Sequence, residues 1–278
     1  MNKKFRYLLL LLFLVLGLAA GCGTADDLSE AGNEGLVNVA GETQADRFDG
    51  DEDFTLSVLS VGDAAAQVVQ ADGETMVVDV GDTDDANTVA AYLESLGVDD
   101  IDVVVLSHGH SDHMGGYRAL DGHNIGKTYV SPQKHDTSTY EKALDLLSRQ
   151  SDELIVPEVG DTFSLGSAEV EFLAPEQQEY DDLNNSSLVV RITYGDTSFL
   201  LPGDMEGIEA DEMLSRFGDD LASDVFVAAH HGSNVDKTNS YTLLRAVNPE
   251  YVVISSAGST SEYGFPHEEV LSRINDLG

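Results

Sequence analysis

Four side chains that can bind metal ions lie within the six residues His108–His113. The segment reads His-Gly-His-Ser-Asp-His and follows the apolar run Asp102–Ser107, which predicts a strand. Neutral imidazoles and carboxylates bind divalent cations, and a dinuclear hydrolytic site holds two of them about 3.5–4 Å apart. On an extended segment the two histidines of His-Gly-His point the same way and can share one cation. The Asp-His pair follows one turn later and can face a second, so the spacing favours a hydrolytic metal centre over a solvated polar loop.

Further ligands are expected where later strands end, because functional residues of α/β sheets collect in the loops that follow strands. The apolar run 197–202 leads to Gly203 and Asp204, whose carboxylate could bridge two cations. The apolar run 224–229 leads to two adjacent histidines, and His267 follows a proline. Structural roles remain open for all of them: a cap or turn for the aspartate, packing for the paired histidines, and the first turn of a helix for His267.

Seven short segments together resemble the metallo-β-lactamase domain of ComEC/Rec2-type competence proteins, which act in DNA uptake. They are Val61–Ala64, Val78–Gly81, Ser107–Gly116, Asn185–Val189, Leu201–Asp204, His230–Ser233 and Tyr263–His267. Their order and spacing are family-like over about residues 54 to 277. The resemblance implies an α/β fold, a four-layer αββα sandwich with the metals at one edge of two sheets. It also implies hydrolysis by water activated on the metals.

The resemblance also implies a role for individual residues. The metal ligands would be His108 and His110 for the first cation, Asp112, His113 and His230 for the second, and Asp204 as the bridge. Asp112 would orient the nucleophile, while His231 and His267 would bind phosphate oxygens or protonate the leaving group. Ser233, Asn185 and Ser187 would bind substrate, and Asp79 would support the site without being a ligand.

The cofactors implied are two divalent cations, Zn²⁺ or alternatively Mn²⁺. Many members of the superfamily carry one more histidine between the first motif and the bridging aspartate. Residues 182–187 read Asp-Leu-Asn-Asn-Ser-Ser at that place. The first cation is therefore expected to be held more loosely than the second.

The N-terminus has the pattern of a lipoprotein signal peptide over residues 1–22. Three basic residues lie in the first six positions, and the apolar run 8–20 is short for a transmembrane helix. Small residues then precede Cys22, which is the single cysteine of the chain, so lipidation is expected there and no disulfide can form within the chain. These features predict an extracytoplasmic protein attached to the membrane through a lipid; an uncleaved N-terminal anchor is the alternative.

Residues 23–53 are acidic and poor in large apolar groups, which predicts a flexible tether, and residues 54–278 predict one hydrolase domain. Hydrophobic periodicity and turn residues predict the elements of this domain. Strands are expected at 54–61, 74–80, 103–107, 169–174, 188–194, 198–202, 225–229 and 251–255. Helices are expected at 85–96, 139–148, 205–217, 239–247 and 267–277.

The chain carries 51 acidic and 14 basic residues, a formal net charge of -37. Such a surface repels itself in dilute buffer but is screened at about 1 M salt, which predicts a high-salt environment; an acidic surface for a cationic partner is the alternative. The composition also lacks the basic groove with aromatics that is typical of nucleic-acid binders. The resemblance nevertheless favours a metal-dependent phosphodiesterase, with single- or double-stranded DNA or another phosphodiester as substrate.

Three other classes of function remain open. The same metals could act on a carbonyl in an esterase or lactonase. A lipid-anchored phosphoesterase could act on head groups of the cell surface. A binding module on an enzyme scaffold would require lost ligands, and the ligand set in this sequence is nearly complete.

Overall fold

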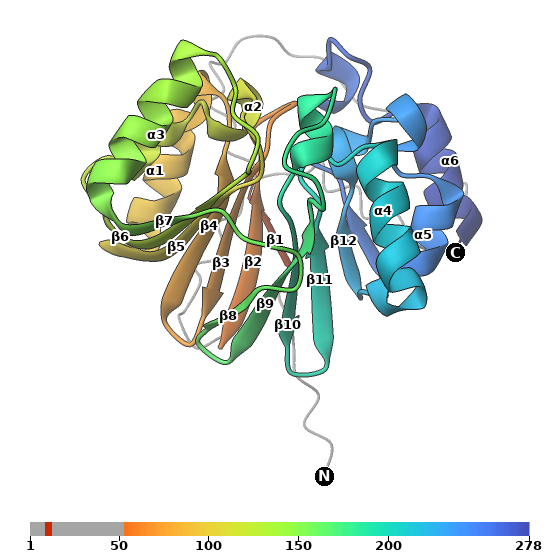
Figure 1. Cartoon of the computed structure of the whole chain (residues 1–278), viewed down its shortest axis with the longest axis horizontal. Coiled ribbons are helices and arrows are strands. Elements are labelled where there is room, and N and C mark those ends of the chain that lie inside the picture. Colours follow the sequence, from red (N-terminus) through yellow and green to blue (C-terminus); the bar gives the residue numbers. More distant parts are fainter. Residues whose placement is uncertain (1–8, 13–52, 278) are drawn as a thin grey trace, which may run out of the picture.

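Two β-sheets pack face to face, and helices cover the outer surface of each sheet (Figure 1). This computed structural model describes residues 9–12 and 53–277. Helices α1 (Ala86–Ser95) and α3 (Ser138–Gln150) lie on the first sheet, and α4 (Gly207–Phe217), α5 (Tyr241–Val247) and α6 (Glu268–Leu277) lie on the side of the second. The prediction of a four-layer αββα sandwich is confirmed.

The first sheet has seven strands in the order β1-β2-β3-β4-β5-β6-β7. Their bounds are β1 Leu9–Leu12, β2 Phe54–Leu59, β3 Ala66–Ala71, β4 Glu74–Val80, β5 Asp100–Leu106, β6 Asn124–Val130 and β7 Ser151–Ile155. Strands β2, β3 and β4 are antiparallel, whereas β4 to β7 are parallel and need crossover connections. The carboxyl ends of β4 and β5 therefore lie at one edge of the sheet.

The second sheet has six strands in the order β13-β12-β11-β10-β9-β8. Their bounds are β8 Thr162–Leu165, β9 Ala168–Ala174, β10 Val189–Tyr194, β11 Thr197–Leu201, β12 Val225–Val227 and β13 Tyr251–Val253. Strands β10 and β11 form an antiparallel hairpin, and β11, β12 and β13 run parallel. The parallel strands bring the chain after β11 and the chain after β12 to a common edge.

Apolar side chains fill the space between the sheets and beneath the helices. Side chains from both sheets, such as Leu56, Val105 and Phe172, form the central core. Leu93 of α1 and Leu147 of α3 are fully buried on the outside of the first sheet, and Met213 of α4 is fully buried on the outside of the second. Because the neighbouring strands β4 and β5 are buried on both faces over most of their length, they read as nearly continuous apolar runs.

The sequence predicted most of the long elements and missed several strands. Strands β3, β6, β7 and β8 were not expected, because short strands with polar residues lack a clear period. Leu9–Leu12, within the predicted signal peptide, form β1 parallel to β2. Cys22 and the predicted tether up to residue 52 lie outside the described residues. Among the described helices, none is long and apolar enough to cross a membrane.

Candidate metal centre

The segment after β5 folds back against the end of β4. It begins the four-residue helix α2 (Ser111–Met114), with His110 in extended conformation at its N-cap position. At Gly116 an added Cβ would lie 2.0 Å from the carbonyl oxygen of Val80, so only glycine permits this close approach. The close approach holds the histidines of the segment at the edge between the two sheets.

Asp79, at the end of β4, fixes the direction of the His113 ring. Its carboxylate accepts hydrogen bonds from the Ser107 amide and hydroxyl, both at 2.7 Å, and its Oδ2 lies 2.8 Å from His113 Nδ1. The Nε2 atom of His113 is thereby turned toward the site. Burial opposes the charged form of His113, but the carboxylates of Asp204, Asp79 and Asp112 outweigh it and raise the pKa of His113 well above its usual value. A cation bound at Nε2 would replace that proton.

Asp204 follows β11 and lies between the two groups of histidines. Its amide donates to Ser187 Oγ at 3.1 Å, and its side chain is almost completely buried. Asp204 Oδ1 lies 2.9 Å from His113 Nε2 and 3.6 Å from His231 Nε2. Asp204 Oδ2 lies 3.9 Å from His108 Nε2 and 3.7 Å from His230 Nε2. Each carboxylate oxygen therefore faces its own pair of imidazoles.

The two histidines after β12 occupy a left-handed turn. His230 has φ 48° and His231 has φ 55°, values that are uncommon for residues with a side chain. Asn239 holds this turn, because its side chain bonds both the amide and the carbonyl of Ala229. The two rings diverge: His230 Nδ1 lies 3.1 Å from Glu206 Oε1, and His231 Nδ1 lies 3.1 Å from the Ser255 carbonyl oxygen.

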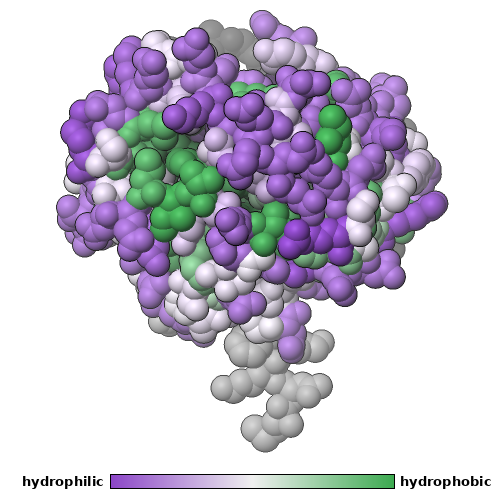
Figure 2. All heavy atoms as spheres, in the orientation of Figure 1, coloured by the Kyte–Doolittle hydropathy of each residue, from purple (hydrophilic) through white to green (hydrophobic). Residues whose placement is uncertain are grey.

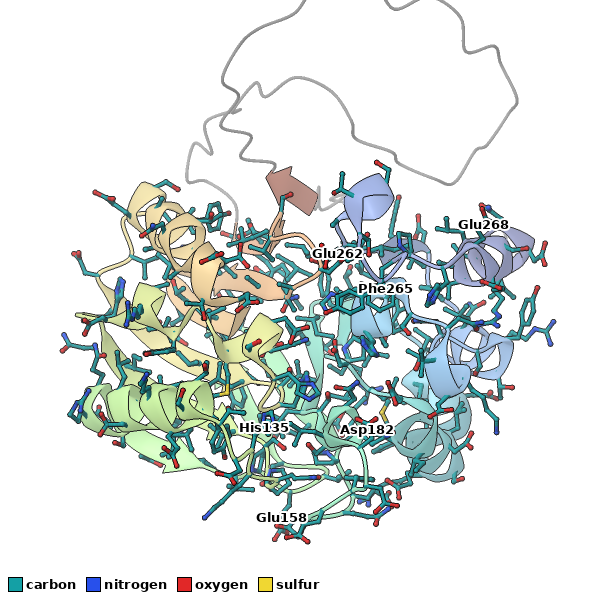
Figure 3. The ribbon with its side chains drawn as sticks, turned by 90° about the horizontal axis from the view of Figure 1, so that it is seen from above. His135, Glu158, Asp182, Glu262, Phe265 and Glu268 are labelled. Atoms are coloured by element: carbon teal, nitrogen blue, oxygen red, sulfur yellow. The ribbon has the colours of Figure 1, made fainter. Side chains whose placement is uncertain are left out.

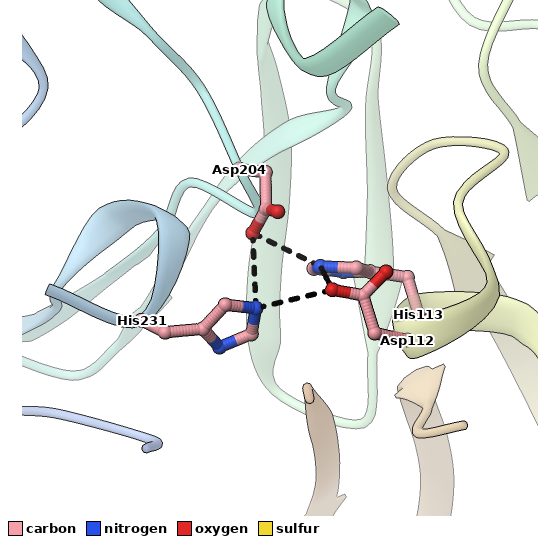
Figure 4. A group of neighbouring side chains, drawn as sticks. All are labelled: Asp112, His113, Asp204 and His231. Atoms are coloured by element: carbon pink, nitrogen blue, oxygen red, sulfur yellow. Dashed lines mark ion pairs between the residues drawn. The ribbon is translucent and has the colours of Figure 1, made fainter. Parts of the chain in front are cut away.

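Four side chains form a compact group of metal-binding atoms (Figure 4). One ligand atom from each of Asp112, His113, Asp204 and His231 lies within 4.8 Å of the other three. His113 Nε2, His231 Nε2 and Asp204 Oδ1 are buried and have no hydrogen-bond partner among the described residues. Buried polar atoms without a partner are costly, and a divalent cation between them would satisfy all three. The donor set and its geometry fit such a cation.

His108 and His110 form a second pair of donors beside this group. His108 Nε2 lies 3.0 Å from His110 Nδ1, close enough for both atoms to bind one cation. Burial lowers the pKa of both histidines, with the positive charge of His113 adding to the effect at His108. Neutral imidazole is the form that binds metals, so both residues are suited to be ligands.

Comparison with known proteins places this geometry in a family. Residues 59–256 match the model of the metallo-beta-lactamase superfamily. The chain belongs to the metallo-beta-lactamase superfamily. Members of this superfamily are typically hydrolytic metalloenzymes, and the histidine and aspartate cluster is the metal-binding feature expected of one.

Two curated relatives are competence proteins. Competence protein ComA of Neisseria gonorrhoeae is 29% identical over 82% of this chain and 30% of its own length. ComE operon protein 3 of Bacillus subtilis is 28% identical over 66% of this chain and 23% of its own length. The chain thus spans less than a third of these relatives. The crystal structure of CmlA, a diiron beta-hydroxylase from Streptomyces venezuelae, shares the fold at 17% identity, with a TM-score of 0.50 over 78% of this chain and 50% of CmlA.

The structure distributes the two adjacent histidines of this superfamily member differently from the sequence-based assignment. His231, expected to contact substrate, lies in the four-residue group with Nε2 3.5 Å from Asp112 Oδ2. His230, expected on the second cation, faces the other oxygen of Asp204. The left-handed turn separates the neighbouring rings, so the geometry favours His231 as the ligand beside Asp112.

The residues expected to bind substrate have partners inside the protein. Asn185 Oδ1 accepts from the Glu209 amide at 3.1 Å, and Ser187 Oγ bonds the Asn184 carbonyl and the Asp204 amide. Ser233 Oγ accepts from the Val235 amide at 3.1 Å, and all three side chains are buried. His267 is half-buried, and its Nδ1 accepts from the Asn234 amide at 2.9 Å.

Three residues near the site were not recognised from the sequence. Glu206 contacts His230, His135 packs its ring against His110 at a centroid distance of 5.4 Å, and Phe265 contacts the rings of both adjacent histidines. Figure 3 shows His135 and Phe265 from above, at the edge where the two sheets with their helices meet. The position of Glu206, two residues after the bridging aspartate, is the one signal that could have identified it.

Proposed function

We propose that this domain is a dinuclear, metal-dependent phosphodiester hydrolase whose leading substrate is DNA. The observation that carries the proposal is the position of Asp204, which presents one oxygen to each group of imidazoles. A carboxylate in this position suits two neighbouring cations, as in enzymes that displace an oxygen at phosphorus. The competence relatives support DNA, because competence is the uptake of DNA.

The side chains around the cations have distinct tasks in this proposal. Divalent cations in such a site supply an activated water and stabilise charge on the phosphoryl oxygens. Asp112 has 32% of its side chain exposed and is the open member of the group, so it orients the attacking water. His267 accepts at Nδ1, so its neutral ring carries the proton on Nε2. That N–H group can donate a hydrogen bond to a phosphate oxygen and so stabilise the charge on it.

The net charge of -37 means that most of the chain would repel DNA rather than attract it. Hydrophilic side chains cover most of the face in Figure 2, and the acidic Asp182 and Glu262 are labelled on the edge seen in Figure 3. Arg191 is paired with Glu171, and the exposed Lys237 lies 3.8 Å from Asp211. Attraction would therefore come from the cations. Salt screens the repulsion between acidic groups and DNA, so KM for DNA should fall as salt rises toward 1 M, opposite to ordinary DNA binders.

Activity assays on the metal-loaded protein in high salt test the proposal. Bis-p-nitrophenyl phosphate and single- and double-stranded DNA are compared with lactones, carboxylic esters and choline-type or glycan phosphates, and Asp112→Ala is the inactive control. Hydrolysis of phosphodiesters, with DNA among the better substrates, supports the proposal. Turnover of lactones or esters alone identifies an esterase or lactonase, and preference for head-group phosphates identifies a surface phosphoesterase. Bound metal without any turnover identifies a binding module.

We also propose that the domain works outside the cytoplasm, held at the membrane by a lipid on Cys22. The support is the pattern of basic, apolar and small residues before this single cysteine. Fractionation of cells that express the full chain or Cys22→Ala tests this. The native chain should sediment with membranes and the variant should not; equal distribution of the two would contradict the proposal.

A further inference from the structure

The first cation has fewer donors than the second in the sequence-based assignment. His108 and His110 supply two imidazoles, and Asp204 Oδ2 supplies an oxygen. The nearby Asn184 and Ser187 are buried, and they bond Glu206 Oε1 and the Asn184 carbonyl. Catalytic sites usually have three protein ligands or more besides water, and this assignment gives the first cation only the smallest of these numbers.

We propose that His230 is a ligand of the first cation and that Glu206 positions it. His230 Nε2 lies 3.7 Å from Asp204 Oδ2, and His108 Nε2 lies 3.9 Å from the same oxygen. The three residues follow three different strands, and both imidazole nitrogens face the carboxylate oxygen that His113 and His231 do not face. The assignment rests on the two-cation site of the proposed function and completes the ligand set of its first cation.

Glu206 and His230 repeat the arrangement of Asp79 and His113. In each pair a buried carboxylate bonds Nδ1, at 3.1 Å for His230 and 2.8 Å for His113, and leaves Nε2 directed at Asp204. Histidines that bind metals almost always donate their other ring nitrogen to a carboxylate, carbonyl or water in this way. Glu206 is only 2% exposed, and burying a carboxylate is unfavourable unless a partner of this kind compensates.

The backbone supports the same assignment. His230 and His231 are successive residues with side chains, and both have positive φ, a conformation that is unfavourable unless the surroundings hold it. The result is that the rings of neighbours lie at 77° to each other, with centroids 5.9 Å apart. One ring reaches each oxygen of Asp204, which regular strand or helix geometry would not give to adjacent residues. A strained turn that aims both rings at one carboxylate is expected of two ligands.

Metal titrations test the assignment without relying on activity. Metal-free protein in high salt is titrated with Co²⁺ and followed by calorimetry and by the visible absorption of the ion, which reports its ligands. The Asp112→Asn variant, which weakens binding of the second cation, serves as the background in which the affinity for the first cation is measured. Adding His230→Ala should lower Co²⁺ affinity at least tenfold and change the absorption spectrum, and adding Glu206→Ala should lower the affinity about 10–100-fold. Glu206→Gln retains an acceptor for Nδ1 and should restore most of the affinity.

His123→Ala is the matched control, because His123 bonds the Asp99 carbonyl at the opposite end of β5 from the site. It should leave both cations unchanged. If His230→Ala does not fold, as judged by circular dichroism, the Glu206 pair of variants still decides the question. If the native protein binds two cations and the His230 and Glu206 variants keep the affinity of the first site, the assignment of His230 is wrong. The dinuclear function would still stand. A single cation in the native protein would instead overturn the dinuclear function.

Discussion

The two histidine-bearing regions of the site are built in opposite ways. The first region, residues 107–116, carries its ligands within one short segment of ordinary backbone, and it needs glycine only for a close approach. The second region, residues 203–206 and 229–233, has positive φ at Gly203, His230, His231 and Gly232. Side-chain direction follows simple periodicity in the first region, whereas in the second it depends on a turn that periodicity does not describe.

The largest expected effect separates Asp204, which we propose is shared by both cations, from a residue proposed to bind only one of them. Asp204→Ala removes the carboxylate between the two groups of imidazoles, so both cations should be lost. His110→Ala should lose mainly the first cation. Activity on bis-p-nitrophenyl phosphate should fall about 100-fold or more in both variants. Elemental analysis of the purified proteins measures the metal content, and full activity in either variant would rule out the dinuclear mechanism.

Replacing Asp79 tests the support of the first region. Asp79→Asn keeps the size of the side chain but loses the charge and one acceptor for the contacts with Ser107 and His113. The affinity for the second cation should fall about 10–100-fold, since the His113 ring loses its fixed orientation. Competition with a chromophoric chelator measures that affinity. An unchanged affinity would show that the short segment orients His113 without Asp79.

The same contrast explains which parts of the site could be predicted from the sequence. The sequence predicted that the segment His108–His113 and Asp204 lie close together, and the structure brings them together, because strand ends determine where they lie. The different directions of the His230 and His231 rings were not predicted, because they depend on two left-handed residues held by Asn239. Glu206 was missed because its role depends on this turn. The fold was predicted from the long apolar elements, whereas β3, β6, β7 and β8 were missed because polar residues interrupt their apolar pattern.

A glycine variant tests the close approach in the first region. Gly116→Ala would place a Cβ 2.0 Å from the Val80 carbonyl oxygen, so the segment must move away from β4. The free energy of unfolding should fall by about 1–3 kcal/mol, as for other overpacked sites. Gly122→Ala, where no atom lies within 4 Å of the new Cβ but φ is 91°, measures the cost of backbone strain alone. Urea unfolding in high salt compares the two variants, and an unchanged stability in Gly116→Ala, whose φ of -74° adds no backbone strain, would contradict a steric role for Gly116.

The smallest expected effect concerns a buried acid that supports the second region. Glu209 in α4 is fully buried, and neither of its carboxylate oxygens has a hydrogen-bond partner among the described residues. Burial, with the nearby charge of Glu212, raises the pKa of Glu209 well above its usual value. The folded protein therefore holds this proton more tightly than the unfolded chain, so the stability from Glu209 is complete below about pH 4.5 and is lost as pH rises through the raised pKa.

Glu209→Gln removes this titration and keeps the shape of the side chain. Its melting temperature should exceed that of the native protein by a few degrees at pH 8. The difference should shrink as the pH falls to about 4.5 and below, because Glu209 then becomes protonated in the folded and in the unfolded protein alike. Asp211→Asn removes one negative charge from the exposed face of the same helix and controls for net charge. A gain in the Glu209 variant that does not depend on pH would contradict a neutral buried carboxyl.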